Sequence, residues 1–195
     1  MGKEIVLELN DEIINSLLPK KIREKSRRFF SPIDLAVQSA KWLSGEDCRN
    51  VLDIGAGIGK FCLCGAFHTK SNFVGIEMRS HLVKIARKLF KSFGLENAKM
   101  LEGSVTDFQF SEYKAFYFYN PFHENLFTFL RMDDSVLLSE QLYKDYLEHT
   151  RTQLSLAEKG SRLVTYHGNN YEIPPDYKIV QEFRGGDLKY WIKEN

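Results

Sequence analysis

The stretch VLDIGAGIGK, from Val51 to Lys60, places glycine at every second position directly after four residues that are typical of a buried strand. Because Gly55, Gly57 and Gly59 lack a Cβ atom, the backbone there can adopt φ values that other residues avoid and can lie directly against a ligand. A helix is predicted to start near the end of the stretch, so its free N–H groups face the same place. The stretch therefore predicts a ligand-binding turn between a strand and a helix.

Downstream of this turn, strand patterns alternate with helical periodicity, as in repeated βαβ units. Helical patterns cover residues 80–93 and about 135–158, and FYFY at 116–119 has the continuous apolar character of a strand covered on both faces. Gly185-Gly186 suits a primed hairpin turn. We predict an α/β fold with a doubly wound, mostly parallel seven-stranded sheet that ends in an antiparallel hairpin. The other predicted strands cover residues 72–77, 98–103, 114–120, 161–167, 177–183 and 188–194.

The residues before the glycine turn indicate an N-terminal helical extension. Asn10 or Asp11 is placed to cap a short helix that Pro19 ends. Ser31 is placed to cap a second helix that closes at Gly45, with proline at its first helical position. The extension therefore consists of helices that precede the alternating part of the chain.

Length and charge limit the possible function classes. With 195 residues, the chain suits one domain (1–195), divided into the helical extension at 1–48 and a Rossmann-like core at 49–195. The 27 basic and 26 acidic residues leave a formal net charge of +1, so the protein lacks the global basic field of many polyanion-binding proteins. Because the chain shows neither a signal-peptide pattern nor a membrane-span window, we expect a soluble cytoplasmic protein.

The spacing of the glycines excludes two common nucleotide-binding motifs. A dinucleotide fingerprint needs glycine where Lys60 lies, and a phosphate loop needs glycine at Ile54 and a hydroxyl residue at Phe61. Glu77 ends the second predicted strand, where a carboxylate is placed to accept hydrogen bonds from ribose hydroxyls. These observations favour a nucleoside ligand.

VLDIGAGIGK, together with GIE at residues 75–77, resembles motif I and the acidic second-strand end of class I S-adenosylmethionine (SAM)-dependent methyltransferases. The resemblance covers roughly residues 31–194 and implies SAM as the cofactor. In that family the first acidic residue and the glycine loop hold the amino-acid part of SAM, the second acidic residue holds the ribose, and residues after the third strand border the adenine. The family often has Asp where Ser104 aligns, and Asp107 is the alternative. The cofactor-binding residues so implied are Asp53, Gly55, Ala56, Gly57, Gly59, Glu77, Met78, Ser104 and Val105.

The sequence YNPFHEN, at the end of the fourth predicted strand, lies where the methyl acceptor is expected. The amide oxygen of Asn120 and the carbonyl of Pro121 can accept hydrogen bonds from an amino group and orient its lone pair, while Phe122 supplies an apolar wall. We therefore predict these three residues as catalytic and nitrogen as the acceptor atom. His123 and Glu124 follow, and either can take a proton or contact substrate. HENLF does not complete a zinc-binding HExxH motif, so no metal is predicted.

Two further resemblances concern the class of acceptor. NPF resembles motif IV of amino-group methyltransferases, although Phe122 replaces the second proline, and FFSP at 29–32 resembles the segment before motif I in adenine-N6 methyltransferases. FVGIEMR and the aromatic-rich end of the fourth strand are similar to the non-SET type of histone-lysine methyltransferase. We predict methyl transfer from SAM to a nitrogen on a protein or small molecule. The alternatives are a nucleic-acid methyltransferase of the adenine-N6 type, a SAM-binding module without catalysis, and a nicotinamide-dependent oxidoreductase.

A basic run, KKIREKSRR, lies between Lys20 and Arg28. Such a run is typical of a solvated helix face, and the alternative is a contact with an acidic partner or nucleic acid. In the second case Phe29 and Phe30 are placed to stack on a flipped base.

Overall fold

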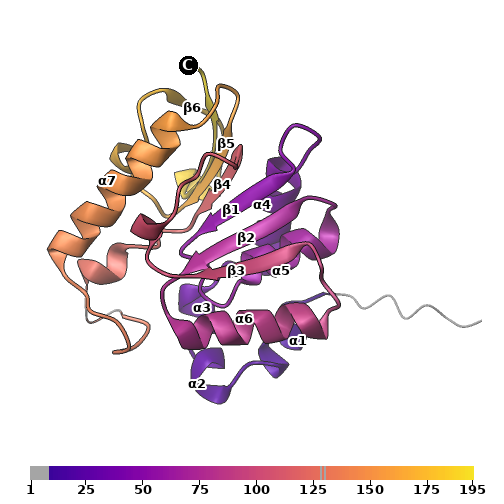
Figure 1. Ribbon diagram of the computed structural model, residues 1–195. Coiled ribbons are helices and arrows are strands. Elements are labelled where there is room, and N and C mark those ends of the chain that lie inside the picture. Colours follow the sequence, from indigo (N-terminus) through magenta and orange to yellow (C-terminus); the bar gives the residue numbers. More distant parts are fainter. Residues whose placement is uncertain (1–8, 128, 130) are drawn as a thin grey trace, which may run out of the picture.

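The computed structural model describes residues 9–127, 129 and 131–195, so residues 1–8 of the predicted extension lie outside the described residues. Seven strands form one sheet with the order β3-β2-β1-β4-β5-β7-β6 (Figure 1). The strands from β3 to β5 pair in parallel, and β7 pairs antiparallel with both β5 and β6, which confirms the predicted sheet and terminal hairpin. The strands are β1 (Asn50–Ile54), β2 (Asn72–Glu77), β3 (Ala98–Glu102), β4 (Ala115–Phe118), β5 (Arg162–Tyr166), β6 (Tyr177–Phe183) and β7 (Leu188–Lys193).

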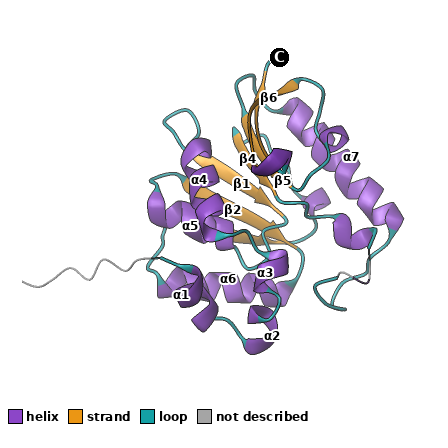
Figure 2. Cartoon of the chain, turned by 180° about the vertical axis from the view of Figure 1, so that it is seen from behind, coloured by secondary structure: helices purple, strands orange, loops and turns teal. Residues whose placement is uncertain are grey.

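Helices cover both faces of the sheet, which confirms the doubly wound architecture. Figure 2 shows α4 and α5 lying across β1 and β2. Apolar residues of α4, α5 and α6 form one core cluster with the sheet, and those of α7 form a second cluster on the opposite face. No helix within the described ranges has the length and apolar character needed to cross a membrane. These helices are α4 (Ile33–Leu43), α5 (Lys60–His68), α6 (Ser80–Ser92) and α7 (Glu140–Leu156).

Strand β4 lies in the middle of the sheet, next to β1. This position accounts for its apolar sequence and for the location of the ligand site. All four residues of β4 are buried, and the ring of Tyr117 stacks on that of Phe61 with centroids 3.8 Å apart. Strand order reverses between β1 and β4, since the chain continues from β1 toward β2 on one side and from β4 toward β5 on the other. In parallel sheets this switch point leaves a crevice at the carboxyl ends of the strands.

Three short helices precede α4 and pack against the core (Figure 1). Asn10 caps the first of them, because its Oδ1 accepts the N–H of Ile13 at 2.9 Å, so the first of the two predicted caps is the one observed. Buried Lys60 pairs with Asp11 at 2.5 Å, which fixes this helix against the start of α5. The three are α1 (Asp11–Ser16), α2 (Lys20–Arg23) and α3 (Ser26–Phe29).

Two predicted helix starts are wrong, because a different residue takes the N-cap position in each case. The hydroxyl of Ser31 does not cap α4 but bonds the hydroxyl of Tyr117 at 2.7 Å, and Pro32 takes the N-cap position without a side-chain bond. Helix α7 starts at Glu140 and not near residue 135, because Ser139 caps it by accepting the N–H of Leu142 at 3.1 Å.

The hairpin between β6 and β7 turns at the two predicted glycines. Gly185 and Gly186 have φ of 68° and 93°, and the carbonyl of Arg184 accepts the N–H of Asp187 at 3.4 Å. Positive φ at both central residues is the property of a primed turn, which confirms that prediction.

Candidate active site

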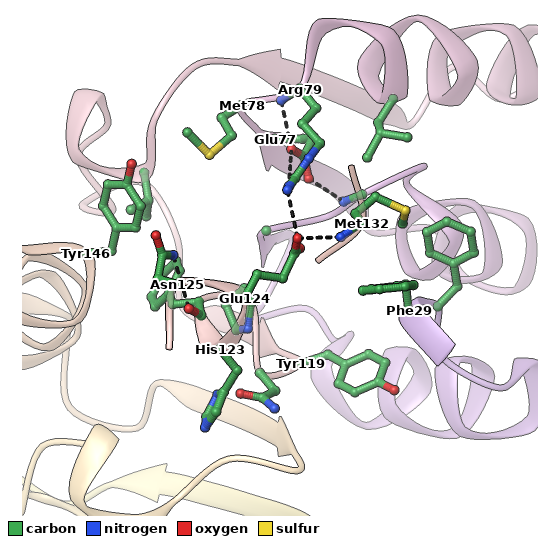
Figure 3. Close-up of a pocket in the computed structure, with 18 of the residues that line it drawn as sticks. Phe29, Glu77, Met78, Arg79, Tyr119, His123, Glu124, Asn125, Met132 and Tyr146 are labelled. Carbon is green, nitrogen blue, oxygen red and sulfur yellow. Dashed lines mark hydrogen bonds and ion pairs between the residues drawn. The ribbon is translucent and has the colours of Figure 1, made fainter. Parts of the chain in front are cut away.

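A cavity of about 530 Å³ lies at the carboxyl ends of β1, β2 and β4, at the switch point of the sheet (Figure 3). Asp53, Ala56, Gly59 and Ser104 lie outside its wall. The other residues predicted from the sequence line it together: Gly55, Gly57, Glu77, Met78, Val105, Asn120, Pro121 and Phe122.

The glycine turn is tightly enclosed. Gly55, Gly57 and Gly59 have φ of 76°, 56° and 67°, the left-handed region that favours glycine. A Cβ atom at Gly55 would overlap the ring of Pro121, and one at Gly57 would lie 3.3 Å from Cε1 of Phe30. The first two glycines therefore let the loop after β4 and the N-terminal segment approach the turn closely.

Gly59 has a different role from the other two glycines. A Cβ atom there would lie 2.7 Å from Cζ of Phe90, within the core between α5 and α6. The third glycine of the motif therefore permits helix packing.

Glu77 joins the ends of β1 and β2. Its Oε2 accepts the N–H of Gly57 at 3.0 Å, and its Oε1 accepts the N–H of Arg79 at 2.8 Å. Burial raises the pKa of Glu77 above its ordinary value of 4.5, while these hydrogen bonds and the Arg79 guanidinium act in the opposite direction. The carboxylate thus fixes the glycine turn and still lines the cavity.

Arg79 connects this carboxylate to the loop after β4, and the sequence did not single it out. Its Nη2 donates to Glu124 at 2.8 Å, and its Nε donates to Asp133 at 3.3 Å. Glu124 also accepts the N–H of Met132 at 2.7 Å (Figure 3). Only 7% of Arg79 is exposed. Its position two residues after Glu77, at the carboxyl end of a parallel strand, was the signal for a site residue.

Two residues after β3 contribute unequally. Val105 supplies an apolar part of the cavity wall. Ser104 is turned away, since its N–H donates to Oδ2 of Asp107 at 2.9 Å and its hydroxyl bonds Thr106 at 2.7 Å. The carboxylate of Asp107, the alternative adenine contact, is engaged in this turn and lies outside the wall.

The loop after β4 carries the predicted acceptor residues. Asn120 has φ of 41°, a strained value that asparagine tolerates better than most residues, and its Oδ1 is buried without a hydrogen-bond partner in the described chain. Phe122 packs edge-on against Phe118 with ring centroids 5.6 Å apart. The loop therefore combines a strained backbone at Asn120 with a buried amide oxygen that has no partner in the described chain.

The N-terminal segment closes one side of the cavity. Arg27, Arg28, Phe29 and Phe30 line it, and the ammonium group of Lys25 donates to the carbonyl of Met132. Residues before the first strand and residues after the fourth therefore meet over the site.

The family model described as "Methyltransferase domain" matches residues 46–184. The chain belongs to this family. The match confirms the predicted class I SAM-dependent methyltransferase and SAM as its cofactor. Comparison with curated proteins finds no match.

Solved structures share the methyltransferase fold at low sequence identity. An RNA methyltransferase from Salinibacter ruber, in complex with S-adenosyl-L-homocysteine (SAH), is 20% identical with a TM-score of 0.56, and the match covers 91% of this chain and 94% of that one. A putative O-methyltransferase from Klebsiella pneumoniae is 12% identical with a TM-score of 0.63, over 97% and 93% of the two chains. These likenesses concern the fold alone.

The cavity of this methyltransferase fits the cofactor of its family. Pockets of about 300 to 1,000 Å³ are usual for ligands of this size. The glycine turn presents backbone without side chains, Glu77 offers a carboxylate for ribose hydroxyls, and Met78 and Val105 offer apolar surface for a base. No cluster of His, Cys, Asp and Glu suited to a metal ion occurs among the described residues.

Asp53 lies buried before the glycine turn, and burial raises its pKa to about 8. The thiol of Cys62, which donates to Oδ2 of Asp53 at 3.6 Å, lowers this pKa, and the charge of Glu77 raises it. The folded protein therefore holds a proton here that the unfolded chain releases above about pH 4, so rising pH between 4 and 8 costs stability. Between pH 6 and pH 8 the free energy of unfolding of the wild type should fall by about 2 kcal/mol because of this group. We expect that fall to be absent in Asp53→Asn.

Thermal unfolding of wild type and variant at both pH values measures this effect. Equal pH dependence of the two proteins would show that Asp53 is already ionised in the folded state.

Proposed function

We propose that the protein transfers the methyl group of SAM to a nitrogen atom on a protein or small molecule. The observation that carries this proposal is Asn120, a residue of the cavity wall whose buried Oδ1 has no partner in the described chain. An amide oxygen only accepts hydrogen bonds, so it selects a group that carries N–H or O–H donors. An amino group satisfies this oxygen and keeps a lone pair for the reaction.

The chain's part in this reaction is positioning and exclusion of water. Bound SAM supplies an activated methyl group, and methyl transfer needs the acceptor lone pair in line with it. Asn120 and the carbonyl of Pro121, which receives no backbone N–H from the described residues, hold the acceptor. Phe122 and the N-terminal segment close the cavity against solvent.

A nucleic-acid acceptor is the second candidate, and the basic run favours it. Arg27, Arg28 and Phe29 lie at the cavity, and the exposed side chains of Lys20 and Lys21 continue the positive charge. Phosphates attract such charges and aromatic rings stack on unpaired bases. Label transfer from methyl-labelled SAM to RNA or DNA, compared with transfer to peptides and small amines, separates the two candidates.

Replacing Asn120 tests the acceptor role directly. We expect Asn120→Gly to lower kcat about tenfold with unchanged SAH affinity, because glycine keeps the positive φ but loses one hydrogen bond of about 1.4 kcal/mol. Asn120→Ala should lower kcat at least as much, since alanine also strains the backbone. Full activity of the glycine variant would remove the amide from the mechanism.

The cysteines support the expected cytoplasmic location. Cys48, Cys62 and Cys64 are free and buried. Free thiols are typical of proteins from reducing compartments, so we propose that the enzyme acts in the cytoplasm.

A further inference from the structure

Two buried polar atoms without partners in the described chain belong to residues of the same cavity wall. They are Oδ1 of Asn120 and Nδ1 of His123. The other unpartnered buried side-chain atoms of the described chain belong to residues outside this wall. A buried polar atom without a partner costs about 1 to 3 kcal/mol, so two of them at one cavity point to a ligand that satisfies both.

We propose that the acceptor is a primary amine and that His123 is the catalytic residue that removes its proton. This inference rests on the proposed nitrogen transfer and adds the acceptor's chemical class and the proton's destination.

His123 lies in a short 3-10 turn, η2 (His123–Asn125), directly after the predicted acceptor residues. Its ring lies between Phe127, with stacked rings 6.3 Å apart, and Tyr143, edge-on at 5.9 Å. In Figure 3 its side chain extends away from that of Glu124, which reaches toward Arg79. The two neighbours therefore have separate tasks: Glu124 holds the loop, and His123 contributes to the cavity wall and keeps a buried ring nitrogen without a partner in the described chain.

The charged group that acts on this imidazole is the carboxylate of Glu172, which is 1% exposed. It accepts the hydroxyl of Tyr143 at 2.9 Å and the N–H of Asn169 at 2.6 Å, and the hydroxyl of Tyr171 lies 3.2 Å from that of Tyr143. Burial lowers the pKa of His123 below its ordinary value of 6.5, and Glu172 acts in the opposite direction. Imidazole is therefore neutral at pH 7, and the fixed carboxylate stabilises the imidazolium once it forms.

The chemistry of the two free atoms selects an amine. In neutral imidazole one ring nitrogen accepts, and the amide oxygen of Asn120 accepts as well, so a ligand that satisfies both atoms needs two donors. A hydroxyl has one hydrogen, whereas a primary ammonium has three. The ammonium loses one proton to Nδ1 of His123, its freed lone pair attacks the methyl carbon, and the carbon–sulfur bond breaks with its electron pair left on sulfur. The product is a methylated ammonium, and the imidazolium returns its proton to solvent.

A second histidine at the cavity is less suited to this task. Nδ1 of His167 lies 3.5 Å from Oδ1 of Asp187, and its ring packs on Tyr166 with centroids 3.9 Å apart. His167 therefore serves as the competing candidate in the test.

The test uses full-length protein, methyl-labelled SAM and two pairs of probes, each an amine and the corresponding alcohol. The first pair is benzylamine and benzyl alcohol. The second is a lysine peptide and the same peptide with hydroxynorleucine in place of lysine. We expect label on the amines only. His123→Gln should lower kcat/KM about 100-fold at pH 7. It should recover above about pH 9, where more amine is unprotonated. SAH affinity should stay within about twofold by calorimetry. The matched control is His68→Gln, whose exposed side chain lies outside the cavity.

The outcomes separate the two proposals. Label on the alcohols, or on no probe, overturns both. Suppose that the amines are labelled and Asn120→Gly loses activity, but His123→Gln keeps the wild-type pH profile. This result overturns only the proton role. The same holds if His167→Gln, and not His123→Gln, shows the loss of activity at pH 7. NMR titration of the imidazole in the SAH-bound protein adds an acceptor-independent result: an imidazole that is mainly neutral at pH 7 supports the proton role, and one that is fully protonated at pH 7 overturns it.

Discussion

Gly57→Val is expected to abolish measurable SAH binding. The residue has φ of 56°, where a β-branched side chain is a severe outlier, and its Cβ atom would lie 3.3 Å from the ring of Phe30. The left-handed conformation alone costs about 1 to 2 kcal/mol, and the added methyl groups enter space at the cavity wall. Together these effects should weaken SAH at least about 100-fold. Calorimetric titration with SAH, and with NAD as comparison ligand, measures the loss.

The matched control is Gly160→Val. Gly160 has φ of 82°, but no atom lies within 4 Å of its Cβ position, and it lies outside the cavity wall. This variant should carry the same kind of backbone strain with unchanged SAH affinity. Strong SAH binding by Gly57→Val would show that the glycine turn does not hold the cofactor.

Arg79→Met is expected to cause the largest loss of stability among single substitutions at the site. The guanidinium is buried among three carboxylates, at 2.8 Å from Glu124, 3.3 Å from Asp133 and 3.9 Å from Glu77. Removing one partner of a buried ion pair costs about 3 to 5 kcal/mol, because the remaining charge stays buried. In a protein of this size that loss lowers Tm by about 10 °C. SAH affinity should also fall, since Glu77 fixes the glycine turn.

Arg131→Met provides the control for Arg79→Met. Arg131 pairs with Asp134 at 2.6 Å, but both side chains are exposed, and such pairs are worth about 0 to 1 kcal/mol. Thermal unfolding and SAH titration of both variants distinguish the two positions. A similarly small change in Tm for both would mean that the carboxylates around Arg79 reach solvent or other partners.

The sequence predicted the sheet and its hairpin because these depend on local chemistry. Four buried residues of β4 need continuous apolar sequence, and Gly185 and Gly186 tolerate the positive φ of their turn. It did not predict the start of α4, because the hydroxyl of Ser31 bonds Tyr117, 86 positions away. A hydrogen bond between distant segments has no local sequence pattern.

The same distinction applies to the site. The cavity brings together Gly57, Glu77 and Asn120, which strand ends and motif spacing had indicated. The ion-pair network of Arg79 was missed because Asp133 lies 54 positions away, in a loop without a regular pattern. The buried Glu172 near His123 was missed for the same reason, since it is contributed by a turn after β5.

The contacts of the N-terminal helices also set an order of events during synthesis. Ser31 bonds Tyr117, and Lys25 bonds the carbonyl of Met132, so these contacts form only after about one hundred further residues have been made. At ribosomal rates of roughly 5 to 20 residues per second, Lys25 and Ser31 wait about 5 to 20 s for these partners. The segment with Lys25 and Ser31 is therefore made early but completes its contacts late, and chaperones have a defined interval in which to bind it.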